Sequence, residues 1–97
     1  MGFKLTGEAA EDLIQIYAVG ITLFGEEQAA NYHSGLYRTF ELLGENPELA
    51  RQREEISPPV RIHPFGSHVI VYIVDDDGDA LIVRVRHGRE NWLDDPV

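Results

Sequence analysis

The sequence predicts an α+β domain, with a helix hairpin packed on one face of a mainly antiparallel, four-stranded sheet. Two regions with different apolar patterns carry this prediction. Residues 8–45 place apolar side chains at helical spacing. Residues 60–86 instead form short apolar runs separated by turn signals. A short alternating segment, residues 3–5, precedes the helices, so the expected element order is β-α-α-β-β-β.

The first helix is expected to span residues 8–24. Thr6 is a suitable N-cap, acidic residues follow it at the positive end of the helix dipole, and Gly25 breaks the pattern. The second helix is expected to continue to residue 45. Pro47 closes it, because the residue before a proline avoids helical geometry.

Residues 46–59 are polar and rich in proline, so we expect a loop. The three strands predicted after it are residues 60–65, 68–74 and 80–86. Pro64 favours an edge position for the first of them, since proline cannot donate to a neighbouring strand. The helix hairpin can carry the chain back across the sheet, so the first strand is expected beside the last.

The composition of the chain limits the classes of function that it could have. The 97 residues are expected to form one domain, residues 1–97, with no cysteine for disulfides or thiolate metal sites. A net charge of −9, from 8 basic and 17 acidic residues, disfavours direct binding to DNA or RNA and favours a protein partner. No apolar run is long enough for a membrane span, and Lys4 and Glu8 interrupt the place of a signal peptide. We expect a cytoplasmic protein.

The first helix is apolar around an unusually wide arc. One apolar face is followed by a second, made by Ala9, Ile16, Val19 and Leu23. One sheet cannot cover so wide an arc. Either the neighbouring helix covers the remainder, or part of the second face stays open and receives a partner. The two interpretations are compatible.

Metal and cofactor sites are not expected. Residues 75–79 resemble a calcium loop, but Ala80 and Arg86 stand where an EF-hand needs glycine and glutamate, so we interpret them as a hairpin turn. Three histidines lie on or beside the predicted strands: His63, His68 and His87. No carboxylate lies at ligand spacing, so structural or interface roles are favoured over a metal site.

A metal-free ribonuclease is an alternative interpretation of the basic residues. The residues that would serve it are Arg61, Tyr72, Arg84, Arg86, His87 and Arg89. Arg84 and Arg86 share one strand face, opposite Val83 and Val85, which favours a solvated face or ion pairs with a partner. We therefore assign no catalytic residue.

Several motifs in order resemble the ParE branch of the RelE/ParE toxin superfamily. They are the segments at residues 45–49, 51–55, 65–72 and 84–89. Each is weak alone, but together they cover essentially the whole chain. The resemblance implies a RelE/ParE-like fold and a non-enzymatic toxin of a type II toxin–antitoxin system. Such a toxin inhibits DNA gyrase and is neutralised by a ParD-type antitoxin.

Two alternatives stay open. RelE-branch members with this fold cleave mRNA on the ribosome, but they generally carry a basic surface, and this chain is acidic. The second alternative is a homologue that binds antitoxin without being toxic. The low basic content near the C-terminus also departs from the pattern expected of the ParE branch.

We predict two sets of binding residues. Antitoxin binding is assigned to Ile16, Val19, Leu23, Arg61, Arg84 and Arg86, as apolar anchors and as partners for the antitoxin's acids. Target binding is assigned to His87, Arg89 and Trp92, in the basic and aromatic run after the last strand.

Overall fold

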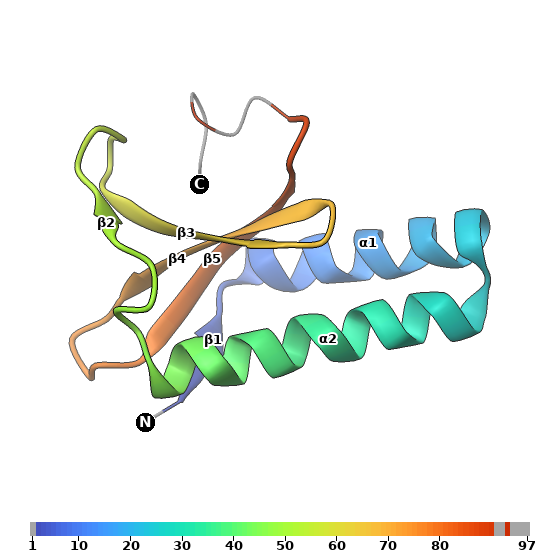
Figure 1. Cartoon of the computed structure of the whole chain (residues 1–97), viewed down its shortest axis with the longest axis horizontal. Helices are drawn as coiled ribbons and strands as arrows, with labels where there is room; N and C mark the ends of the chain where they lie inside the picture. Colours follow the sequence, from blue (N-terminus) through green and yellow to red (C-terminus); the bar gives the residue numbers. More distant parts are fainter. Residues whose placement is uncertain (1, 91–92, 94–97) are drawn as a thin grey trace.

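The computed structural model of the chain describes residues 2–90 and Leu93. Two long helices form an antiparallel hairpin beside a twisted sheet, and the hairpin extends past one end of the strands (Figure 1). The elements in chain order are β1 (Phe3–Leu5), α1 (Gly7–Phe24), α2 (Glu26–Glu45), β2 (Gln52–Arg53), β3 (Val60–Phe65), β4 (His68–Val74) and β5 (Ala80–His87). The predicted α+β class is confirmed.

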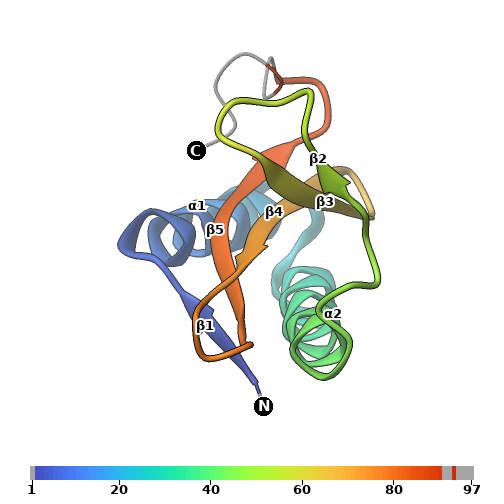
Figure 2. The ribbon, with the colours of Figure 1, turned by 90° about the vertical axis from the view of Figure 1, so that its left-hand side faces the viewer.

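The strands form one sheet in the order β1-β5-β4-β3-β2. β1 runs parallel to β5, with Phe3 opposite Ala80, and the other neighbouring strands are antiparallel. The expected placement of the first strand beside the last is confirmed. Figure 2 looks along the helix hairpin and shows β1 beside β5. The hairpin lies between these strands in sequence and supplies the long crossover that a parallel pair requires.

The sheet has five strands rather than the expected four. β2 lies in the segment 46–59, which we expected to be a loop, and pairs through Gln52 and Arg53 with Arg61 and Val60 of β3. Two polar residues are too few to carry an alternating pattern, so no local signal marks them. Gln52 and Arg53 form a strand only because they pair with β3 in the folded domain.

The main core lies between the sheet and the helices. Its buried members are Ala9, Leu13, Leu36, Phe40, Leu43, Ile70, Tyr72, Ala80, Ile82 and Val85. Val71 lies between Ile70 and Tyr72 in sequence and therefore points to the opposite face of the sheet. There it joins a smaller cluster with Ile56, Val60 and Ile62.

A β-bulge in β5 changes which of its side chains reach the core. The register shifts between Val71 and Tyr72 of β4, so that Val83 is an extra residue on β5. An extra residue moves the alternation of faces by one position. Ile82 and Val85, three residues apart, therefore both lie in the main core, whereas Val83 is only partly buried. Strict alternation of faces therefore does not extend through this strand.

The predicted N-cap of α1 is confirmed, and it also joins the helix to the sheet. The Ala9 amide donates to Thr6 Oγ1 at 3.1 Å, and the Thr6 hydroxyl donates to the Val83 carbonyl at 2.7 Å. The Thr6 amide donates to the Ile82 carbonyl at 3.0 Å. Thr6 thus continues the pairing of β5 just past the end of β1.

We expect Gly44→Ala to lower the free energy of unfolding by about 1–3 kcal/mol. Gly44 is buried on α2, and a methyl group there would come within 2.7 Å of the Gly2 carbonyl carbon. Backbone cannot rotate away as a side chain can. Chemical denaturation measures the loss. Gly7→Ala is the matched control, since nothing lies within 4 Å of that position. Equal stability of the two variants would contradict the prediction.

Candidate functional site: a groove on the helix hairpin

An apolar groove lies between the helix hairpin and the end of the sheet nearest to it. Its volume is about 450 Å³. α1 and α2 supply most of its walls, and β4 and β5 each contribute a histidine. Its principal lining residues are Ile16, Val19, Leu23, Phe24, Tyr32, His68 and His87.

The wide apolar arc of α1 is partly covered and partly open. Ile16 packs against the main core. Val19 and Leu23, one and two turns further along, remain 52% and 65% exposed. Two further apolar side chains of α1, Ile14 and Phe24, are also 67% and 62% exposed. The arc is therefore covered in part and open in part, and Ile16, Val19 and Leu23, the three predicted apolar anchors, line one groove.

Tyr32, His68 and His87 form the polar end of the groove. Tyr32 Oη lies 2.6 Å from His68 Nδ1, and the Ser67 amide donates to the same hydroxyl at 3.1 Å. The rings of His68 and His87 lie 5.2 Å apart between centroids. Burial, followed by the neighbouring His87, lowers the pKa of His68. Burial raises the pKa of Tyr32.

Close packing of the β3–β4 turn on α2 puts these groups together. A methyl group at Gly35 of α2 would lie 2.6 Å from the ring of Phe65, so any side chain there would force the ring to shift. Gly66 turns the chain with φ of +54°, a conformation that favours glycine. His68 then begins β4 directly opposite His87 of β5. The sequence did not single out Tyr32, because an aromatic residue at an apolar position of a helix indicates only a core contact.

The predicted target-binding residues lie at and after the end of β5. His87 lines the groove and thus lies beside the predicted antitoxin anchors. Arg89 is exposed in the turn that follows, and its amide donates to His87 Nδ1 at 3.1 Å. The Glu90 carboxylate accepts from the His87 amide at 2.8 Å. Trp92 lies outside the described residues.

The predicted antitoxin-binding arginines all have partners within the chain. Arg84 donates to both carboxylate oxygens of Asp12 on α1, at 2.7 and 3.0 Å. The Val85 amide donates to the same carboxylate at 3.0 Å, so Asp12 covers the edge of β5 that β1 leaves open. Arg86 pairs with Glu90 at 2.9 Å. Arg61 donates to the Ala50 carbonyl. The structure therefore gives these side chains positions in the fold, apart from the groove.

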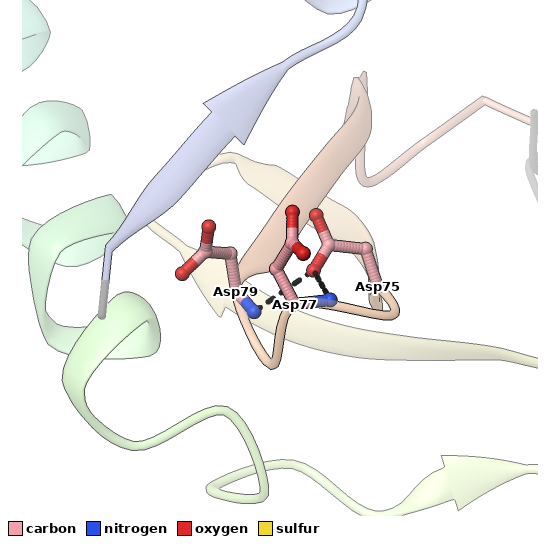
Figure 3. Close-up of side chains that lie close together, drawn as sticks. All are labelled: Asp75, Asp77 and Asp79. Carbon is pink, nitrogen blue, oxygen red and sulfur yellow. Dashed lines mark hydrogen bonds between the residues drawn. The ribbon is translucent and has the colours of Figure 1, made fainter.

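Asp75, Asp77 and Asp79 bring their carboxylates together on the β4–β5 turn (Figure 3). Asp75 accepts from the amides of Asp77 and Asp79, each at 2.9 Å, as expected of a tight turn. The Lys4 ammonium of β1 lies 2.8, 2.9 and 3.3 Å from the three carboxylates. It supplies the positive charge that a metal ion would bring. His63 lies on β3, opposite Ile70, and does not line the groove with the other two histidines.

We expect Lys4→Gln to lower the melting temperature, and to do so less in 1 M salt, where exposed ion pairs are screened. The hydrogen bond from Lys4 lowers the pKa of Asp75 below the ordinary 3.8. The stabilisation is therefore present above that value and lost as the pH falls through the lowered pKa. Thermal melts over pH 2–7 measure this loss. A rise in the melting temperature of the unsubstituted protein on adding calcium would contradict the assignment of Lys4.

Comparison with known proteins gives the family. Residues 3–92 match the family described as "ParE toxin of type II toxin-antitoxin system, parDE". This chain belongs to the ParE toxin family. The predicted resemblance to the ParE branch is confirmed, and it includes the strands and helices that form the groove.

Individual relatives agree with this membership. "Toxin ParE1" of Caulobacter vibrioides is 33% identical over 89 residues, which is 92% of this chain and 91% of the relative. "Toxin ParE1" of Mycobacterium tuberculosis is 31% identical over 87 residues, covering 90% and 89%. A solved structure, "Chromosomal ParDE TA system from P. aeruginosa", matches the fold with a TM-score of 0.75 at 24% identity, over 90% of this chain and 95% of that one. Within the described residues, no helix is long and apolar enough to cross a membrane.

Proposed function

We propose that this chain is the toxin of a type II toxin–antitoxin system, that it acts in the cytoplasm by inhibiting DNA gyrase, and that a ParD-type antitoxin neutralises it. Membership of the ParE family supports the general assignment. The observation that carries the antitoxin part is the open apolar groove, in which Val19 and Leu23 remain more than half exposed. Contiguous exposed apolar surface on a small domain is typical of a protein-binding site.

The groove is suited to an amphipathic helix. Ile16, Val19 and Leu23 follow one another along α1 at helical spacing, and Tyr32 of α2 lies across from them. Apolar side chains from an antitoxin helix would fill this space, each burial contributing roughly 1–3 kcal/mol. Several such anchors suffice for a tight complex.

We propose that the three arginines contribute less to antitoxin binding than the apolar side chains do. Arg84 and Arg86 keep side-chain exposures of 24% and 12% while paired with Asp12 and Glu90. Arg61 likewise holds the Ala50 carbonyl. Contacts between these arginines and acidic groups of the antitoxin would add to ion pairs and hydrogen bonds that the fold already uses. We therefore place most of the antitoxin affinity in the apolar anchors.

Gyrase contact is proposed for His87 and Arg89, together with Trp92. Arg89 is exposed, and its side chain extends from a turn rather than from the sheet. His87 also lines the groove. An antitoxin in the groove would therefore cover part of the surface proposed for gyrase, which offers a steric route to neutralisation.

A ribosome-dependent mRNA interferase is the alternative function. Tyr32, His68 and His87 lie close together and could exchange protons, as metal-free RNA cleavage requires. The net charge of −9 opposes docking on ribosomal RNA. Two of the arginines that might hold a phosphate, Arg84 and Arg86, are already paired with carboxylates of the chain. We therefore favour a non-enzymatic gyrase inhibitor.

Induced expression in bacteria tests the proposal. We expect growth arrest with a DNA damage response and intact mRNA, and recovery when a ParD-type antitoxin is co-expressed. Leu36→Asp is the control, because Leu36 is completely buried and the variant should not fold. Rapid translation arrest with cut transcripts and no DNA damage would instead identify an interferase. Unimpaired growth would indicate a homologue that binds antitoxin without toxicity.

A further inference from the structure

Two imidazole rings lie face to edge at the polar end of the groove. His68 and His87 are direct partners across β4 and β5, and their rings lie 5.2 Å apart with an angle of 73° between them. Both side chains are only partly exposed and both line the groove. Two imidazolium charges at this distance would repel each other, so the pair resists double protonation.

Each ring uses its Nδ1 atom differently. The Arg89 amide donates to Nδ1 of His87 at 3.1 Å, so that nitrogen must carry a lone pair. Protonation of His87 would place a hydrogen there and remove this acceptor. Nδ1 of His68 lies 2.6 Å from Tyr32 Oη, which either ring tautomer can satisfy. The turn after β5 therefore uses Nδ1 of His87 as a hydrogen-bond acceptor.

The other side chains that face His68 and His87 neutralise a positive charge on these rings only in part. α2 contributes Tyr32 and His33, and α1 contributes Tyr17 as its only titratable side chain among the lining residues. After β5, the Glu90 carboxylate favours an imidazolium on His68. That carboxylate already accepts from Arg86 and from the His87 amide. Arg89, in the same turn, is a further positive charge.

We propose that partner docking in this groove is coupled to proton release from His68, so that the complex is tight when this ring is neutral and weakens as the pH falls. This inference rests on the proposed binding of a ParD-type antitoxin. Apolar side chains that fill the groove would displace the water around both rings. A charged ring in such surroundings would lose its hydration without gaining a new partner.

The direction in which affinity changes with pH follows from proton linkage. Burial and the neighbouring ring already lower the pKa of His68 in the free chain. Complete burial under a partner lowers it further. The complex then binds fewer protons than the free chain, so affinity increases with pH up to the free-state pKa and is constant above it. An apolar partner should therefore bind the groove more tightly at neutral than at acidic pH.

The test uses the ParD-type antitoxin whose co-expression restores growth. Calorimetric titration of the full chain with this antitoxin is expected to give roughly fivefold weaker binding at pH 5.5 than at pH 7.5. Titrations at pH 6 in buffers of different ionisation enthalpy should show net proton release. The double variant His68→Gln with His87→Gln should bind with nearly equal affinity at both pH values. His63→Gln, outside the groove, should keep the pH dependence of the unsubstituted chain.

The outcomes separate the two proposals. Tight binding with the same affinity at both pH values, or the same pH dependence in the double variant, would overturn proton coupling and leave the antitoxin proposal standing. Tighter binding at pH 5.5 would also overturn it and would indicate an acidic group of the antitoxin pairing with an imidazolium. Failure of the antitoxin to bind at either pH would overturn both. Melting temperatures of the variants confirm that each remains folded.

Discussion

Leu23→Asp is expected to weaken antitoxin binding at least about 100-fold while leaving the melting temperature nearly unchanged. Leu23 is 65% exposed in the free chain, so the carboxylate stays hydrated when the domain folds. In the complex, the same position would be covered by apolar side chains. The lost apolar contact and the buried charge then add to several kcal/mol. Val19→Asp, at a position 52% exposed, should behave in the same way.

Two substitutions on the same helix serve as controls for this prediction. Ile14→Asp introduces the same charge at a site that is 67% exposed and outside the groove, so it should keep full antitoxin affinity. Leu13→Asp places a carboxylate at a site only 3% exposed and should unfold the domain. Calorimetry and thermal melts measure the two effects separately. A sharp fall in melting temperature for Leu23→Asp with unchanged affinity would identify Leu23 as a core residue.

Arg84→Glu is expected to lower the free energy of unfolding by about 3 kcal/mol. The side chains of Arg84 and Asp12 are 24% and 16% exposed and form two hydrogen bonds to each other. Glutamate would put two carboxylates together in this partly buried place. The repulsion would also disturb the Val85 amide, which donates to Asp12 at the edge of β5. Chemical denaturation measures the loss.

Arg51→Glu is the matched control for Arg84→Glu. Arg51 pairs with Glu55 at 3.0 Å, but these side chains are 68% and 54% exposed, so the same change of charge should cost little. Adding Asp12→Arg to Arg84→Glu should recover part of the stability by restoring opposite charges. A variant Arg84→Glu that melts normally but loses antitoxin affinity would make Arg84 chiefly an antitoxin contact, as its sequence pattern first suggested.

The sequence by itself determined the features whose signals are local. Thr6 caps α1 because a threonine side chain accepts a backbone amide from the first helical turn. The Asp-Gly pair at residues 77–78 turns the chain between β4 and β5. The apolar spacing of α1 showed an arc too wide for one sheet, and this excess carried the prediction that Val19 and Leu23 are available to a partner. Each of these depends on residues within a few positions of one another.

Only the tertiary structure decided the features that join distant residues. The bulge at Val83 depends on how β5 pairs with β4. No periodic pattern in the sequence predicts that β5 has one extra residue at this point. Arg84 turns to Asp12, 72 positions away, because α1 runs along the edge of β5 that β1 leaves open. The His68–His87 pair depends on strand register, and its place in the groove depends on how closely α2 lets Phe65 approach Gly35. Such contacts are set by packing between complete elements, and the local sequence carries no trace of them.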